Sequence, residues 1–308
     1  MPPVSRTVAV LMLLVCTALW GFAFVAQKWA MDSMGALTFG GVRYLIAGVV
    51  ILPLALWEYR RRAQPISRAN WRLIAVFSVV FFFGAYLQQW GLLTTSATNG
   101  GFLTGLYVLF VPVIAFLALR TRPHPILYLC VPLALLGLYY LNGGGFSSFN
   151  GGDGLVVMSA VFWAVHVLML SFLGRSTGLP IFVSAVSFLV SGAIAMIAAL
   201  VVESPTLEGI VQGWPVILYA SVLSTAVAFT LQAIGQLYVP PGNAAIILSS
   251  ESLFAALGGA LLLGERLPPI GYVGAGLMFL AILAVETVPA LVSRRRGVRD
   301  VAPSKIVN

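Results

Sequence analysis

Residues 88–99 read QQWGLLTTSATN, and residues 232–243, which lie 144 positions further along the chain, read QAIGQLYVPPGN. A gapless comparison at this offset therefore places Gln88 on Gln232. At the same offset the chain also matches Gly91 with Gly235, Asn99 with Asn243, Arg122 with Arg266, Pro125 with Pro269, Tyr128 with Tyr272 and residues 43–48 with 187–192. At an offset of 143, Trp20 matches Trp163. Because Gln, Asn, Pro and Trp matches are informative in an apolar chain, the sequence predicts two copies of one unit.

The composition of the chain indicates that lipid is its solvent. Of 308 residues, 60% are hydrophobic and only 8% are charged, whereas soluble domains carry roughly 25% charged residues. Ten apolar runs are long enough to cross a bilayer as helices. They lie at 8–28, 36–57, 71–93, 98–119, 125–142, 154–173, 179–202, 214–237, 243–263 and 269–288. We therefore predict an all-α polytopic membrane protein with ten transmembrane helices.

The repeat and the spans together predict an inverted architecture. Each copy holds five spans, at 8–142 and 154–288, followed by a basic tail at 289–308. Since five is odd, the second copy enters the membrane from the side opposite to the first. Inverted repeats are typical of carriers in which two halves exchange conformations around a site near the bilayer midplane.

The basic residues predict the orientation of the chain. With both termini in the cytoplasm, fourteen of the seventeen Lys and Arg residues fall on the cytoplasmic side, among them Arg60, Arg61 and Arg62. The opposite orientation would reverse this bias and break the positive-inside rule. The net charge of +8 is thereby explained by topology and lipid headgroups, and we expect no nucleic-acid partner.

Arg43 and Glu251 are the two formal charges deep inside predicted spans, and His166 is the one deep histidine. A lone charge at the bilayer centre costs about 3 kcal/mol, so such groups need a partner or a wet cavity. Glu251 could face a cargo ammonium, take up a proton or join two helices as a hydrogen-bonded carboxyl. His166 could line the cavity or pack between helices, and Arg43 has either a gating role or a structural one, bonding helix ends or carbonyls.

Amide and aromatic side chains on inward stripes of the spans complete the candidate cavity. Ser159, Trp163 and His166 share one face of their helix because they stand at positions i, i+4 and i+7. Deep aromatic rings could stack on a cargo ring or shield an ammonium, with plain core packing as the alternative. We take as substrate-binding candidates Trp20, Tyr86, Gln88, Asn99, Tyr107, Trp163, His166, Gln232, Asn243 and Glu251.

Several stretches resemble the drug/metabolite transporter superfamily of EamA type. They are Trp20-Gly21 with Phe22-Ala23-Phe24, the run 43–47, the run 251–257 and Leu263-Gly264-Glu265. The resemblance covers essentially the whole chain and implies ten spans in two EamA repeats. Family members usually have Pro after the Glu that matches Glu251, where this chain has Ser252, and Tyr107 occupies the position of Glu251 in the first copy.

The aromatic-rich interior also resembles the YddG-type amino-acid exporters. That resemblance implies a bacterial inner-membrane location and amino-acid cargo, aromatic and other neutral ones included. The predicted partners are thus a small-molecule substrate and the lipid bilayer, with a monomer as the plausible oligomeric state.

The residues inside the predicted spans favour some classes of function over others. A transporter that exports small metabolites by alternating access fits an interior with one Arg and one Glu, since these could hold a zwitterion. A sugar-phosphate or nucleotide-sugar carrier would need several buried cations, and a channel is a further alternative. His124 and His166 are the sole histidines, and the chain has neither H-E-x-x-H nor G-x-S-x-G. We therefore expect no enzyme, no metal and no cofactor.

Overall fold

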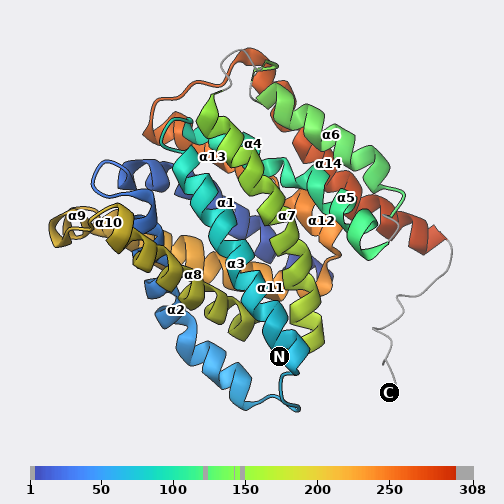
Figure 1. Ribbon diagram of the computed structural model, residues 1–308. Helices are drawn as coiled ribbons and strands as arrows, with labels where there is room; N and C mark the ends of the chain where they lie inside the picture. The colour runs from blue at the N-terminus through green and yellow to red at the C-terminus, as the bar shows by residue number, and fades with distance from the viewer. Residues whose placement is uncertain (1–3, 121–123, 142, 146–149, 296–308) are drawn as a thin grey trace.

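Every regular element in the described part of the protein is a helix, as predicted. The computed structural model describes residues 4–120, 124–141, 143–145 and 150–295 (Figure 1). The elements are α1 Arg6–Ala30, α2 Ala36–Arg60, α3 Arg68–Gly91, α4 Ala97–Gly105, α5 Tyr107–Leu119, α6 Leu127–Leu141, α7 Gly151–Thr177, α8 Pro180–Val202, α9 Leu207–Gln212, α10 Trp214–Leu218, the π-helix η1 Tyr219–Val227, α11 Ala228–Tyr238, α12 Pro241–Leu248, α13 Glu251–Leu262 and α14 Pro269–Arg295. Residues 296–308 of the predicted tail lie outside the described residues.

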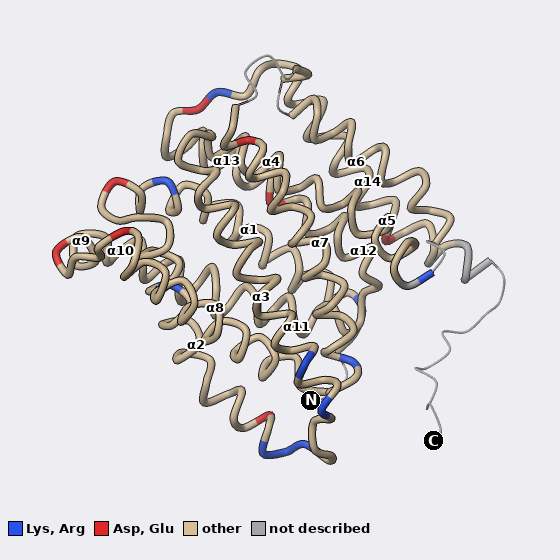
Figure 2. The backbone as a smooth tube through the Cα atoms, viewed as in Figure 1, with Lys and Arg blue, Asp and Glu red and all other residues tan. Residues whose placement is uncertain are grey.

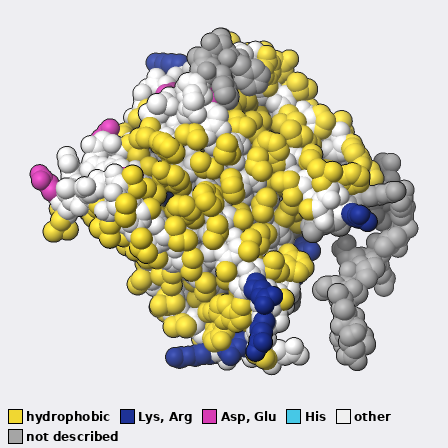
Figure 3. All heavy atoms as spheres, in the orientation of Figure 1, with side chains coloured by type: hydrophobic (Ala, Val, Ile, Leu, Met, Phe, Trp, Pro, Cys, Tyr) yellow, Lys and Arg dark blue, Asp and Glu magenta, His cyan; other side chains and the backbone are white. Residues whose placement is uncertain are grey.

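The helices have the dimensions and surface of membrane spans. Nine helical segments among the described residues are long and apolar enough to cross a bilayer, and α6, with 15 residues, is a shorter apolar helix. Large apolar side chains lie exposed around the bundle, including Val201 at 83% and Leu117 at 72%. Hydrophobic atoms cover the middle of the face shown in Figure 3, and charged ones lie toward its edges. The outside of the bundle is therefore matched to lipid.

Two spans are interrupted at equivalent positions. The span 97–119 breaks at Leu106, between α4 and α5, and the span 241–262 breaks at Ser249 and Ser250, between α12 and α13. Leu106 and Ser250 are 144 residues apart, which is the repeat offset. The hydroxyls of Ser249 and Ser250 donate to carbonyls three residues back, and such bonds compete with the helical pattern. Both copies thus bring a helix break to the core.

Packing between the two copies follows a pseudo-two-fold axis. Helices α2 and α8, which are repeat mates, form the most extensive helix pair. A Cβ atom at Gly48 would lie 2.6 Å from Leu189 Cδ2, and one at Gly192 would lie 2.8 Å from the Leu45 amide nitrogen. Gly48 and Gly192 are equivalent under the repeat offset, as are Leu45 and Leu189. The same close approach therefore occurs twice: the glycine of each copy packs against the equivalent leucine of the other copy.

Carboxylates at the ends of α2 and α8 also form contacts that each copy makes to the other. Glu58, near the end of α2, accepts a hydrogen bond of 2.8 Å from the Phe182 amide at the start of α8. Glu203, at the end of α8, accepts bonds of 2.8 Å from the amides of Leu37 and Thr38 at the start of α2. The mate helices thus run antiparallel, so the two copies are inverted as predicted. An acid at a helix N-terminus also complements the helix dipole.

Charge divides the bundle into two ends (Figure 2). Arg60 ends α2, and Arg61 and Arg62 follow it at the end that also holds Arg175; we name it the basic end. The acidic end is the opposite one, where the chain carries Asp32, Asp153, Glu203, Glu208 and Glu265.

Candidate functional site

A small cavity lies at the centre of the bundle, between the two copies. Its volume is about 40 Å³, which holds roughly three water molecules. The lining residues are Trp20, Ala23, Phe24, Gln27, Arg43, Tyr44, Gln88, Thr104, Tyr107, Trp163, His166, Val167, Ser224, Phe229, Gln232, Leu248 and Glu251. Ligand pockets commonly measure ~300–1,000 Å³. The central space in this structure is therefore smaller than a typical ligand pocket.

Arg43 crosses from one copy to the other at the cavity wall. Its Nε donates to Thr225 Oγ1 at 2.8 Å and its Nη2 donates to Ser224 Oγ at 2.9 Å. The guanidinium also lies over the ring of Tyr44, 5.1 Å from its centroid. Trp20 Nε1 donates to the Ser224 carbonyl at 2.9 Å. Arg43 and Trp20 of the first copy thus converge on a single turn of η1 in the second.

Aromatic rings build one wall of the cavity. His166 stacks on Phe77 with ring centroids 4.8 Å apart, and Trp163 meets Phe81 edge-on at 5.5 Å. Phe229 reaches both His166 and Trp20, at 5.7 Å and 4.6 Å. The rings of Trp163, His166 and Phe229 line the cavity, with Phe77 and Phe81 packed behind them, so the wall suits aromatic or amphipathic molecules.

Five polar atoms on the cavity lining are buried without a hydrogen-bond partner among the described residues. They are Tyr107 Oη, Trp163 Nε1, His166 Nδ1, Gln232 Oε1 and Glu251 Oε1. An unsatisfied buried polar group costs about 1–3 kcal/mol. Native proteins retain such groups where a ligand or water completes them. The set contains donors and acceptors, so it is matched to a molecule that carries both.

The helix breaks place two of these atoms in related positions. Tyr107 is the first residue of α5 and Glu251 the first residue of α13, 144 residues later. The Tyr107 hydroxyl comes near the Glu251 carboxyl, yet neither the hydroxyl nor Glu251 Oε1 has a hydrogen bond of ordinary geometry within the described chain. The pseudo-two-fold thus pairs an aromatic hydroxyl with a carboxyl.

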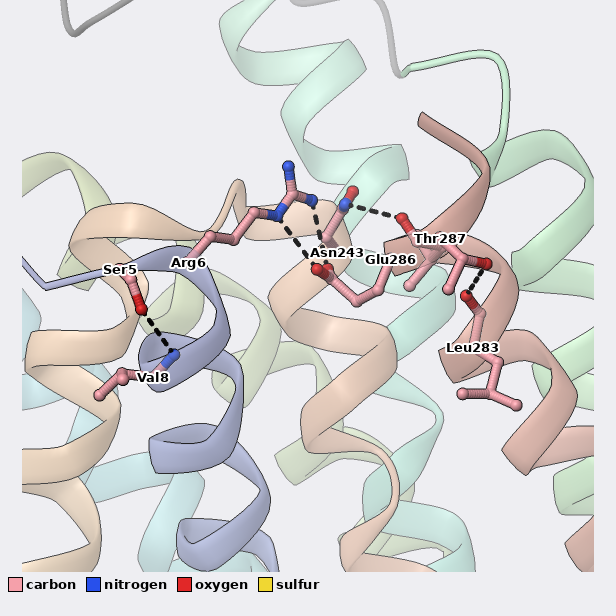
Figure 4. Close-up of polar contacts among 8 residues, drawn as sticks. Ser5, Arg6, Val8, Asn243, Leu283, Glu286 and Thr287 are labelled. Carbon is pink, nitrogen blue, oxygen red and sulfur yellow. Dashed lines mark hydrogen bonds and ion pairs between the residues drawn. The ribbon is translucent and has the colours of Figure 1, made fainter. Parts of the chain in front are cut away.

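Three predicted site residues lie away from the central cavity. Tyr86 lines a separate small cavity between α2 and α3. The Asn99 side chain donates to Asp153 Oδ1 at 2.7 Å, at the acidic end. Asn243 lies at the basic end, where its Nδ2 donates to the Val285 carbonyl beside the Arg6–Glu286 ion pair (Figure 4). Trp20, Gln88, Tyr107, Trp163, His166, Gln232, Glu251 and Arg43 do line the cavity.

Several residues that line the cavity are not among the predicted site residues. Phe229 carried no signal beyond its residue type, whereas Gln27 lies two turns beyond Trp20 on the same helix. Thr104 belongs to the region of the helix break and accepts a bond from Gln88 Nε2 at 2.9 Å. The π-helix η1 was also missed. It spans nine residues and turns Ser224 and Thr225 toward Arg43. π-Helical segments are frequent at functional sites.

The acidic end carries further contacts between the copies. The Glu265 carboxylate, after α13, accepts bonds from the amides of Ala97 and Thr98 at 3.2 and 3.1 Å and from the Thr98 hydroxyl. Asp153, in the first turn of α7, accepts from Thr95 Oγ1 at 2.9 Å. We call the contacts of Glu203 and Glu265 with the α2 and α4 N-termini the acidic-end latches. The Glu58 contact is the basic-end latch.

Comparison with known proteins agrees with the repeat seen in the packing. The model of the EamA-like transporter family matches residues 7–143 and matches again at residues 150–287. The chain belongs to the EamA-like transporter family. It is 32% identical over 287 residues to an uncharacterised transporter of Archaeoglobus fulgidus, covering 92% of this chain and 87% of the relative. It is 22% identical to YedA, an uncharacterised inner membrane transporter of Escherichia coli K12, over 87% of each.

The fold of this EamA-like transporter is also found in a crystal structure. The match has a TM-score of 0.74 at 16% identity and covers 95% of this chain and 99% of the other. The family places the EamA-like chain among membrane transporters of the drug/metabolite superfamily. The central cavity between the two matched regions is therefore the candidate transport site.

Proposed function

We propose that this transporter exports small amphipathic metabolites, above all aromatic and other neutral amino acids, across a bacterial inner membrane by alternating access. The observation that carries the proposal is the set of unpartnered donors and acceptors in one cavity that both copies enclose. The ammonium of an amino acid supplies donors for the unpaired acceptors, and its carboxylate supplies acceptors for the unpaired donors. The ring wall formed by Trp20, Trp163 and Phe229 accepts an apolar side chain.

The charges of the cavity favour a zwitterion over a phosphorylated cargo. Arg43 and Glu251 are the formal charges among the described lining residues, so a zwitterion balances them. A sugar phosphate or a nucleotide sugar carries a dianion that several cations usually neutralise. Arg43 already donates to Ser224 and Thr225. The flux experiment below distinguishes amino-acid export from these phosphorylated cargoes, from other metabolites or drugs, and from a channel.

The latches support alternating access. We propose that the repeats 8–142 and 154–288 rock against each other, that the basic end, where α1 begins and α14 ends, faces the cytoplasm, and that each end opens when its latches break. Both chain termini would then be cytoplasmic. A latch bond is made between copies at one end only. Opening one end therefore spares the latches of the other, which gives two states around one cavity.

A liposome flux screen tests the cargo and the mechanism. Saturable flux of aromatic and neutral amino acids, stimulated by the same amino acid on the opposite side, is the expected result. Linear flux without countertransport would identify a channel, and preference for sugar phosphates would reject the amino-acid proposal. Flux with and without an imposed pH gradient separates proton antiport, in which Glu251 carries the proton, from uniport.

Variants of the cavity test the site. We expect Trp163→Ala, His166→Ala and Gln232→Ala each to lower flux at least tenfold, about the effect of losing one good ligand contact of ~1.4 kcal/mol, while the yield of folded protein stays near that of the parent. Matched controls of the same residue types are Trp214→Ala, His124→Ala and Gln212→Ala, at exposed positions. Flux is measured per mole of folded protein. Equal loss of folded protein in the cavity variants and unchanged flux per mole would make these packing residues.

A further inference from the structure

A second hollow lies at the basic end, far larger than the central cavity. Its volume is about 800 Å³, within the ~300–1,000 Å³ range of ligand pockets. It lies between the α2–α3 connection and the α7–α8 turn, and the end of α11 contributes its floor. The lining residues are Trp57, Glu58, Arg61, Arg62, Ala63, Gln64, Pro65, Ile66, Asn70, Arg175, Ser176, Thr177, Gly178, Leu179, Pro180, Leu237 and Tyr238. We call this hollow the arginine groove.

The arginine groove carries positive charge that the protein does not neutralise. Arg61, Arg62 and Arg175 line it, and none of them forms an ion pair among the described residues, where Arg6–Glu286 is the recorded pair. Glu58, the one acid of the described lining, is 7% exposed and is committed to the Phe182 amide. A hollow with three guanidiniums and no available carboxylate favours an anion with several acceptor oxygens.

Aromatic stacking orders two of the guanidinium groups before any ligand binds. Arg61 lies 4.3 Å above the Trp57 ring, and Arg62 lies 3.6 Å above the Tyr59 ring. Arg62 Nη1 also donates to the Tyr59 carbonyl at 2.7 Å. Tyr59 in turn stacks on Phe182 at 4.6 Å, and Phe182 is held by Glu58. Side chains that are ordered before binding lose less entropy when the ligand arrives.

The position of the groove points to lipid as the source of that anion. Arg61 and Arg62 directly follow the apolar span α2, and residues just beyond a span are expected to lie at the level of the lipid headgroups. Trp57 and Trp71 are exposed at the same end, 44% and 41%, as interfacial belt residues are. Ile66, Leu179 and Leu237 give the groove an apolar side, which matches the glycerol and acyl region. The basic side chains gather near the lower edge of Figure 3.

We propose that the arginine groove is a binding site for the phosphate headgroup of an anionic phospholipid. The guanidiniums of Arg61, Arg62 and Arg175 hold the phosphodiester, and Asn70 and Thr177 border the headgroup hydroxyls. Basic pockets between spans are a recurrent form of headgroup site. Bound lipid bridges α2 of the first copy and the α7–α8 turn of the second, so it stabilises the state in which the basic-end latch is closed.

Lipid titration of the full-length protein in detergent tests the proposal. Phosphatidylglycerol and phosphatidylcholine are added separately, and bound lipid is counted by native mass spectrometry. We expect one phosphatidylglycerol to bind at least tenfold more tightly than phosphatidylcholine. Each basic residue near an anionic headgroup contributes ~1 kcal/mol, about fivefold in affinity. The variant Arg61→Ala/Arg62→Ala/Arg175→Ala should therefore lose more than tenfold in affinity for phosphatidylglycerol.

The matched control removes equal charge from the same end outside the groove. Arg60, Arg68 and Arg72 are exposed and do not line the groove, so Arg60→Ala/Arg68→Ala/Arg72→Ala should change the affinity less than threefold. Equal losses in both triple variants would mean diffuse surface charge and would overturn the site. If the groove variant folds poorly, Arg175→Gln replaces it, with an expected loss of about fivefold.

Competition separates lipid from a soluble phosphate. Inorganic phosphate and glycerol phosphate are added to the lipid complex as probes. If the groove recognises lipid, neither displaces phosphatidylglycerol at millimolar concentration, because neither fills the apolar side. Displacement by either compound, with equal affinity for it and for the lipid, would assign the groove to a soluble anion and reject the lipid proposal.

Discussion

The two ends of the bundle are built from the same repeat but are closed differently. At the acidic end, Glu203 and Glu265 each accept three hydrogen bonds at a helix N-terminus of the other copy. At the basic end, Glu58 repeats the contact of Glu203, whereas the position 144 residues before Glu265 is Thr121, which has no carboxylate. The basic end also holds the arginine groove.

This difference indicates that symmetry between the copies fixes the helix packing and leaves the strength of each closure to a few side chains. The glycine contacts of α2 and α8 are made in both directions, because they depend on backbone shape. A latch requires one acid at one position, so a single substitution adds or removes it. The acidic-end latches therefore make more hydrogen bonds between the copies than the basic-end latch does.

The largest effect is expected from removing both acidic-end latches. Hydrogen bonds to a charged group contribute ~1.5–3 kcal/mol. Because both carboxylates are partly exposed, we take the low value for each latch. Glu203→Ala/Glu265→Ala should then favour opening of the acidic end by about 3 kcal/mol, roughly 100-fold in population. The measurement is maleimide labelling of Gln27→Cys, a cavity residue, in a background with Cys16 and Cys130 replaced by Ala.

Glu208→Ala serves as the control for the double variant, since Glu208 is an exposed acid on α9. Its labelling rate should match that of the parent. If the double variant labels no faster than this control, the carboxylates do not close the acidic end and the comparison between the ends fails.

A smaller effect in the opposite direction is expected from the basic-end latch. Glu58→Ala removes one charged hydrogen bond of ~1.5–3 kcal/mol, so opening of the basic end should rise by tenfold or more. Ala233→Cys reports this opening, because Ala233 is buried in the apolar layer with Phe77 and Leu170. Faster labelling of Ala233→Cys with unchanged labelling of Gln27→Cys is the expected pattern.

Glu286→Ala controls for loss of charge at the basic end. It breaks the Arg6–Glu286 pair, which is largely exposed on the Arg side, and exposed ion pairs contribute ~0–1 kcal/mol. An equal rise in labelling for Glu286→Ala and Glu58→Ala would show that any acid at this end acts alike and that the reciprocal latch has no special role.

The smallest effect is expected from the threonine hydroxyls of the acidic-end latches. Thr38 Oγ1 donates to Glu203 at 2.8 Å, and Thr98 Oγ1 donates to Glu265. Thr38→Val and Thr98→Val should each raise labelling of Gln27→Cys about fivefold, from ~1 kcal/mol per hydrogen bond. Thr230→Val is the control, because the Thr230 hydroxyl bonds the Ala226 carbonyl of its own helical segment. Equal rates for all three variants would assign no role to the hydroxyls.

The chain of apolar runs and the repeat were sufficient to predict the helices and their inversion. Apolar length and an odd number of spans per copy leave few alternatives in lipid, where every backbone group must be paired within the helix. The cavity was predicted less completely. Trp163, His166 and Gln232 lie where their helical stripes indicated, but Asn99 and Asn243 do not, because polar residues near span ends satisfy local bonds as readily as distant ones.

By itself, then, the sequence determined the solvent, the repeat and its opposed orientation, since these follow from composition and from matches at one offset. The tertiary structure determines which acids form latches and which polar atoms in the central cavity have no partner. It also determines that a π-helix turns Ser224 and Thr225 toward Arg43, and that three arginines line one groove. The latches and the Arg43 bonds join residues more than 100 positions apart in the sequence, and the groove brings Arg61 and Arg175 onto one lining from similarly distant positions, so no local pattern encodes these arrangements.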